Sequence, residues 1–144
     1  MPSRFFPDAN PLRWLAWSAA AVAAVLSAFA HYAALYRVGR FDLLVHAVTA
    51  AALTLLLAAY MRAMLPGVWR PASYVAALVA LGVAIGAAWE VGEWLYDALT
   101  HGNAIRGKTD TMTDLVADAL GALFAAATAL AVERRHVKAS GAPL

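Results

Sequence analysis

The third of four long apolar stretches in the chain runs from Tyr74 to Leu99 and reads YVAALVALGVAIGAAWEVGEWLYDAL. It is longer than the roughly 20 apolar residues that a helix needs to cross a bilayer. Glu90 and Glu93 nevertheless lie well inside it. A charged side chain at membrane depth costs at least about 2.5–3.5 kcal/mol on insertion scales. The stretch therefore indicates a transmembrane helix that carries a polar site.

The rest of the chain has the same character. Its 144 residues are 63% hydrophobic and 14% charged, whereas soluble domains are about 45–50% apolar and about 25% charged. We therefore expect an all-α fold, a single domain over residues 1–144 built as an integral membrane bundle of four antiparallel helices. The expected helices cover residues 12–36, 41–65, 72–99 and 111–135. A competing interpretation of the first stretch is a signal peptide with a cleavage site at Ala28-Phe29-Ala30.

Basic residues indicate how the bundle is oriented. Seven Lys or Arg residues lie on the side that holds both termini and the second loop, and four lie on the other side. Because basic residues accumulate on the cytoplasmic side, we expect both termini in the cytoplasm. The basic residues are scattered rather than clustered, which argues against a nucleic-acid partner. The absence of cysteine excludes disulfides and thiolate ligands.

Acidic residues are sorted far more strongly than basic ones. Seven of the nine belong to the side opposite the termini, and they are Asp42, Glu90, Glu93, Asp97, Asp110, Asp114 and Asp118. Spacings of three or four residues place the pairs Asp42/His46, Glu90/Glu93 and Asp114/Asp118 each on one face of a helix. On the third and fourth of the expected helices the same faces carry glycines, which allow close helix packing, so these two faces are expected to point into the bundle.

The four basic residues on that side cannot neutralise seven carboxylates, so a bound divalent cation, protons held by raised pKa values or a water-filled opening must balance the remaining charge. Of these, we expect a divalent metal site. The expected ligands are Asp42, His46, Glu90, Glu93, Asp114 and Asp118. Oxygen ligands with one imidazole suit Mg²⁺, Mn²⁺, Fe²⁺ or Zn²⁺. Glu93 and Asp114 are the expected catalytic residues, with a carboxylate such as Glu93 as general base. The basic residues near the same rim, expected to hold an anionic lipid head group, are Arg37, Arg40, Arg106 and Lys108.

Each of these residues also has a structural interpretation. Asp42 and Asp110 stand at helix starts, where a carboxylate caps backbone N–H groups. Glu90 and Glu93 could instead form salt bridges to Arg37, Arg40 or Arg106. An Asp42–His46 hydrogen bond needs no metal, and Asp97 is expected to be solvated. The tryptophans fit an interfacial aromatic belt.

The motifs on the last three helices resemble those of YjdF-like bacterial inner-membrane proteins and, more loosely, VanZ-like proteins. They are Phe41-Asp42-x-x-Val45-His46, Gly86-Ala87-Ala88-Trp89-Glu90-x-x-Glu93-Trp94 and Asp110-Thr111-x-x-Asp114-x-x-x-Asp118-x-x-Gly121. The likeness covers roughly residues 41–125. The chain is shorter than the usual YjdF-like protein, and Asp118 stands where the VanZ-like pattern has Asn. The resemblance implies an inner-membrane location and a shared polar site, without supplying a reaction.

Three classes of function follow from the sequence. The first is metal-dependent hydrolysis or transfer on a phosphate or ester of a membrane lipid or lipid-linked substrate, at the outer membrane face. The second is proton- or cation-coupled transport, which would require a homo-oligomer because four short helices leave little room for a pathway. The third is a small structural membrane subunit that binds a partner through the charged residues at one end of the bundle.

Overall fold

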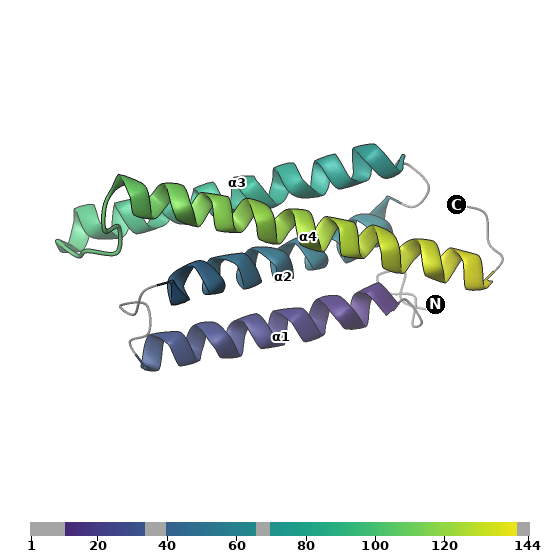
Figure 1. Cartoon of the computed structure of the whole chain (residues 1–144), viewed down its shortest axis with the longest axis horizontal. Coiled ribbons are helices and arrows are strands. Elements are labelled where there is room, and N and C mark those ends of the chain that lie inside the picture. Colours follow the sequence, from purple (N-terminus) through teal and green to yellow (C-terminus); the bar gives the residue numbers. More distant parts are fainter. Residues whose placement is uncertain (1–10, 34–39, 66–69, 141–144) are drawn as a thin grey trace.

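The structure, a computed structural model, describes residues 11–33, 40–65 and 70–140. Over these ranges it contains four helices and no strand: α1 (Pro11–Tyr32), α2 (Phe41–Met64), α3 (Pro71–Thr100) and α4 (Lys108–Ser140). All four are long and apolar enough to cross a membrane. Successive helices run in opposite directions, so α1 begins where α4 ends (Figure 1). The predicted all-α membrane bundle is confirmed.

The helix ends differ from the sequence expectation chiefly in α4. This helix spans Lys108–Ser140, whereas the apolar pattern predicts residues 111–135. Its last turns are polar but rich in Ala, Glu, Arg and Lys, which favour helix, so the helix continues beyond the apolar stretch. α3 starts with Pro71, which suits a first helical position, and ends before His101, whose φ is 57°. The predicted first helix extends to residue 36, but residues 34–39 lie outside the described part.

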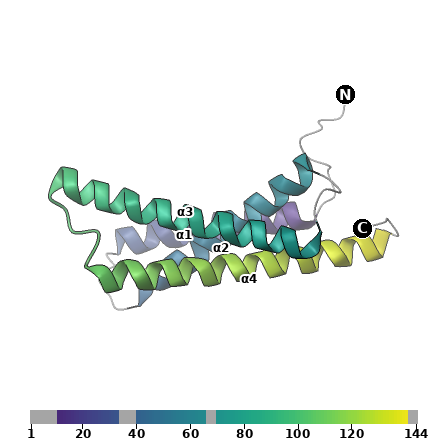
Figure 2. The same cartoon turned by 90° about the horizontal axis from the view of Figure 1, so that it is seen from above.

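α2 and α4 form the centre of the bundle, with α1 packed on α2 and α3 packed mainly on α4. Figure 1 shows α1 and α3 on opposite sides of this pair, and Figure 2 shows the loop that joins α3 to α4. Gly121 on α4 lies directly against the Ala47 backbone on α2, where any side chain would collide with the carbonyl group. Such backbone contacts at small residues are typical of membrane helices. The contact fixes the register of α2 against α4.

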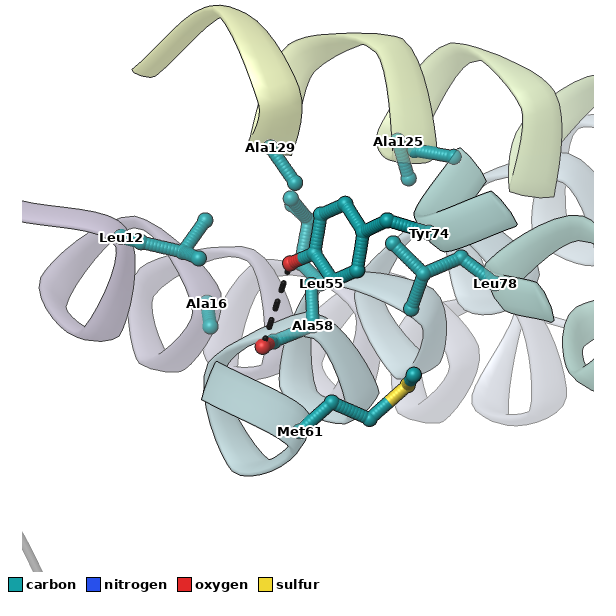
Figure 3. Close-up of a cluster of buried hydrophobic side chains, with 10 residues drawn as sticks. Leu12, Ala16, Leu55, Ala58, Met61, Tyr74, Leu78, Ala125 and Ala129 are labelled. Atoms are coloured by element: carbon teal, nitrogen blue, oxygen red, sulfur yellow. Dashed lines mark hydrogen bonds between the residues drawn. The ribbon is translucent and has the colours of Figure 1, made fainter. Parts of the chain in front are cut away.

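The two ends of the bundle differ in what they bury. We call the end where α1 begins and α4 ends the terminal end, and the end that holds the α3–α4 loop the loop end. Near the terminal end, Tyr74 is fully buried among apolar side chains, and its hydroxyl lies 3.3 Å from the Ala58 carbonyl oxygen (Figure 3). The buried apolar residues of this core are Leu12, Ala16, Leu55, Ala58, Met61, Tyr74, Leu78, Ala125, Ala126 and Ala129. This half of the bundle is closely packed.

A charged cluster beside this core consists of Arg62, Tyr74 and Glu133, and we call it the terminal cluster. Arg62 Nε donates to Glu133 Oε2 at 2.6 Å, and the Tyr74 hydroxyl donates to Glu133 Oε1 at 2.7 Å. The Arg62 guanidinium also stands over the Tyr74 ring, 4.5 Å from its centroid. Glu133 is only 8% exposed, and both of its oxygens have partners. The cluster therefore ties α2, α3 and α4 together at the terminal end.

Candidate metal centre

At the loop end, His46 lies between two carboxylates from different helices. Its Nδ1 is 3.3 Å from Asp118 Oδ1 on α4, and its Nε2 is 3.9 Å from Asp42 Oδ1, one turn earlier on α2. Asp42 and His46 share a face because they are four residues apart on a helix. Because a carboxylate can only accept, the Nδ1–H of His46 donates to Asp118. This hydrogen bond leaves Nε2 as the nitrogen that can bind a metal.

Three of the predicted ligands come together in the structure. One donor atom each from Asp42, His46 and Asp114 lies within 4.8 Å of the others. Ligands of a bound Mg²⁺ at 2.0–2.1 Å stand about 3–4 Å apart, so these groups need to converge only slightly. Asp114 is 3% exposed and His46 is 9% exposed. We call Asp42, His46 and Asp114 the metal group.

Asp118 is not one of the three residues of the metal group, but it contacts His46, which is. Its carboxylate occupies the space left by the missing side chain of Gly86 on α3, where a Cβ atom would collide with it. Asp118 is 4% exposed, and its Oδ2 has no hydrogen-bond partner. The structure therefore places next to His46 a buried carboxylate oxygen that can still accept a proton or bind a cation.

The other two predicted ligands, Glu90 and Glu93, lie apart from the metal group. Glu93 accepts a hydrogen bond from Trp89 Nε1 at 2.9 Å on its own helix. Glu90 is 5% exposed, and neither of its oxygens has a hydrogen-bond partner among the described residues. Arg106, one of the alternative salt-bridge partners of these two residues, forms ion pairs with Asp42 and Asp110.

Arg106 contacts Asp42 and Asp110, which brings a cation to the edge of the metal group. Desolvation lowers the pKa of the guanidinium, but the interactions with Asp110 and Asp42 outweigh it and raise the pKa above its usual value. Asp110 also accepts the backbone N–H of Arg106 at 3.0 Å, which agrees with its alternative interpretation as a helix-start residue.

The loop that presents Arg106 is held by Asp97. Its two carboxylate oxygens accept the backbone N–H groups of Ala104 at 2.7 Å and Ile105 at 2.9 Å. The expectation that Asp97 is solvated is therefore wrong. Sequence spacing could not reveal this role, because the donors are backbone groups of apolar residues.

Two of the other basic residues predicted at this rim are described by the structure. Arg40 precedes α2 and Lys108 begins α4, and both side chains are exposed. Arg37 lies outside the described residues. Of the three predicted head-group residues that the structure describes, Arg106 is the one with an ion pair to the metal group.

A cavity of about 440 Å³ adjoins the metal group. Its charged end is formed by Asp42, His46, Glu93, Arg106 and Asp118, and its remaining walls come from α1, α2, α3 and the α3–α4 loop. The volume falls within the roughly 300–1,000 Å³ that is usual for small-molecule sites. The cavity gives a ligand access to the candidate metal centre.

The chain matches the model of one protein family along most of its length. The match covers residues 3–135, and the family is described as predicted membrane protein (DUF2238). The chain belongs to this family. Every residue of the metal group, the cavity and the terminal cluster falls inside the matched range. No curated protein and no solved structure matches the chain.

Proposed function

We propose that this membrane protein binds a divalent cation through Asp42, His46 and Asp114 and uses it to hydrolyse or transfer a phosphate or ester group of a membrane lipid. The observation that carries the proposal is the convergence of one donor atom from each of these residues within 4.8 Å. Two oxygens and one imidazole nitrogen suit Mg²⁺, Mn²⁺, Fe²⁺ or Zn²⁺. The remaining coordination positions would be filled by water or substrate.

The charge balance at the loop end supports a bound cation. Arg106 is shared between Asp42 and Asp110, while Asp114, Asp118 and Glu90 are each at most 5% exposed. Buried carboxylates that lack a charged partner or a metal are strongly unfavourable. A divalent cation among them would offset this cost.

The hydrogen bond from His46 to Asp118 supports a metal role for the imidazole. Histidines that bind metals usually donate the other ring N–H to a carboxylate or carbonyl, which fixes the ring and raises its basicity. Asp118 supplies this carboxylate on Nδ1, so Nε2 faces Asp42 and the metal group. We therefore assign Asp118 as a positioning residue and Asp42, His46 and Asp114 as the ligands.

The proposed reaction uses water and a general base. A cation held by Asp42, His46 and Asp114 would polarise the phosphate or ester oxygen. Glu93, which lines the cavity, accepts a proton from water as the water oxygen forms a bond to phosphorus or to the carbonyl carbon. The bond from that atom to the lipid alcohol oxygen then breaks, and the alcohol oxygen takes the proton back from Glu93. Arg106 at the cavity rim would contact the anionic group.

Packing at the terminal end disfavours transport. The core around Tyr74 and the paired charges of the terminal cluster fill the half of the bundle that a transported ion would have to cross. An ion pathway requires polar groups or water along its whole length. A site confined to one half suits a surface reaction better than a channel through one bundle.

We further propose a bacterial inner-membrane location with both termini in the cytoplasm and the metal centre at the outer face. The excess of basic residues on the terminal side supports this orientation. The resemblance of the Trp-Glu-x-x-Glu-Trp motif and the flanking helix motifs to YjdF-like proteins supports the location.

Metal analysis of the purified protein tests the proposal. After loading with Mn²⁺ or Zn²⁺ and removal of excess ion, wild type is expected to retain stoichiometric metal, and Asp114→Asn is expected to lose it. Asp110→Asn removes an acid one turn away that is outside the metal group, so it should retain the metal. Equal metal content in wild type and Asp114→Asn, or none in either, contradicts the assignment.

A second measurement addresses the reaction. Vesicles of phosphatidylethanolamine and phosphatidylglycerol are incubated with the loaded protein, and released phosphate esters and fatty acids are measured by mass spectrometry. Glu93→Gln should keep the metal but lose the activity. Unchanged turnover in Glu93→Gln would remove Glu93 from the mechanism, and no turnover by wild type would contradict the lipid reaction.

A further inference from the structure

The cavity extends from the metal group into the membrane-spanning part of the bundle. On α2 its lining residues run from Asp42 to Leu53, and on α3 they run back from Glu93 to Gly82. Eleven residues along a helix correspond to about 16 Å. This length equals about half of the roughly 30 Å hydrocarbon thickness of a bilayer. The cavity therefore reaches from one membrane face to about the middle of the membrane.

The walls of the cavity change from polar to apolar along this path. Most of the charged residues lie toward the loop end, where Val45 adjoins His46. The inner part is lined mostly by apolar residues and by two hydroxyl groups, from Ser27, Thr49, Ala50, Leu53, Gly82 and Ile85. Beyond Leu53 the interior is closed, because Thr54 is fully buried and Leu55 belongs to the packed core. The cavity is thus a blind, largely apolar slot with a charged opening.

The slot has a side opening toward the lipid. Its lining comes from α1 on one side and α3 on the other. In the described residues, α1 and α3 have no pair of Cα atoms within 8 Å of each other. Leu53 and Ile85 are each 37% exposed, and Trp89 is 62% exposed. In a bilayer these exposed apolar side chains contact lipid chains, which places the edge of the slot against the hydrocarbon.

We propose that the slot accommodates one acyl chain of a membrane phospholipid, which enters sideways between α1 and α3 and places the phosphate at the metal centre. The apolar lining fits a hydrocarbon chain, and the one-leaflet length keeps the head group at the membrane face. Arg106 and the bound cation supply positive charge at the mouth, where the phosphate is negative. This inference rests on the proposed function and names its substrate class.

Photocrosslinking of the full chain tests the acyl-chain site. A phosphatidylglycerol with a diazirine in one acyl chain is mixed into vesicles that contain the protein, and adducts are mapped by peptide mass spectrometry. We expect adducts at Val45 and Ala50, which are each 6% exposed and are reached only through the slot. Exposed Leu120 and Phe124 on α4 report contact with bulk lipid in the same sample. Adducts confined to such exposed residues would overturn the proposal.

Substitutions that fill the slot test the site further, and the same substitution outside the slot is the matched control. Ala50→Phe is expected to abolish the adduct at Val45 while leaving those at Leu120 and Phe124. Ser27→Phe fills the slot from α1 and provides a second variant if Ala50→Phe does not fold. Ala84→Phe adds the same side chain at an exposed position of α3 outside the slot and should leave all adducts in place. Persistence of the Val45 adduct in a folded Ala50→Phe or Ser27→Phe protein would contradict the site.

The same experiment separates this inference from the metal assignment. Adducts at Val45 and Ala50 in chelator-treated protein would support the acyl-chain site even if metal analysis showed no bound ion. Stoichiometric metal without these adducts would overturn the acyl-chain site and leave the metal centre in place.

Discussion

His46 and Asp118 are 72 residues apart in the sequence, yet Nδ1 of the imidazole lies 3.3 Å from Oδ1 of the carboxylate in the buried interface between α2 and α4. The hydrogen bond sets which imidazole nitrogen faces the metal group. Asp118→Asn keeps the size of the side chain but removes its charge. We expect metal affinity to fall about 10–100-fold with the stoichiometry unchanged at saturation. Isothermal titration with Mn²⁺ measures both, and an unchanged affinity would contradict the positioning role.

Gly86 contributes to the site through the space that it leaves for Asp118. Gly86→Ala would place a methyl group against the Asp118 carboxylate and force it away from His46. We expect a loss of metal affinity similar to that of Asp118→Asn, with destabilisation of about 1–3 kcal/mol from overpacking. Gly92→Ala is the matched control, because a Cβ atom at Gly92 has no neighbour within 4 Å. Equal affinity in the two glycine variants would contradict the role of Gly86.

Removal of the metal should lower the stability of the folded protein. A ligand present at 100 times its Kd stabilises the state that binds it by about 2.7 kcal/mol. Chelator treatment is therefore expected to lower the melting temperature of wild type in detergent, and added Mn²⁺ should restore it. Asp114→Asn should melt at the same temperature with and without Mn²⁺. A chelator effect of equal size in this variant would show that the stabilising ion binds elsewhere.

Stability should depend on the terminal cluster independently of the metal. Glu133→Gln leaves the partly buried Arg62 without its charged partner, and we expect the cost to exceed that of one hydrogen bond but to stay below the about 3–5 kcal/mol of a fully buried ion pair. Tyr74→Phe removes one hydrogen bond and should cost only about 1 kcal/mol. Thermal unfolding in detergent should rank wild type above Tyr74→Phe and Tyr74→Phe above Glu133→Gln. Both variants should bind metal with wild-type stoichiometry, since the cluster lies at the opposite end from the metal group.

Cysteine labelling can determine the orientation of the protein in the membrane. Because the chain has no cysteine of its own, only an introduced cysteine will react with the label. Asn103 in the α3–α4 loop and Ala139 near the end of α4 are both exposed. A membrane-impermeant maleimide added to intact cells is expected to label Asn103→Cys but not Ala139→Cys. Both should react after the cells are opened. The reverse labelling pattern would place the metal centre on the cytoplasmic face.

The fold could be predicted because each apolar stretch is long enough to span a membrane and is separated from the next by turn-forming residues. Helix-face spacing also predicted that Asp42 pairs with His46 on one face and Asp114 with Asp118 on another. Spacing along one helix does not give the register between helices. That register depends on contacts such as Gly121 against the Ala47 backbone, which place Asp118 against His46.

The terminal cluster was missed for a related reason. In the sequence, Arg62 is one of the seven basic residues on the terminal side, and Glu133 is one of the two acids outside the loop side. Both nevertheless lie close to the end of an apolar stretch, where a charge that enters the membrane requires a partner. The signal was therefore present, but the identity of the partner depends on how α2 and α4 are packed.

The packed terminal half of the bundle also has a consequence for the membrane as an electrical barrier. Seven acidic residues lie on the loop side of the bundle. A continuous chain of water molecules from these residues to the other membrane face would conduct protons. The apolar core and the paired charges of the terminal cluster fill this half of the bundle and would interrupt such a chain of water molecules. Chemistry with water and protons can therefore proceed at one face while the membrane keeps its voltage and its proton gradient.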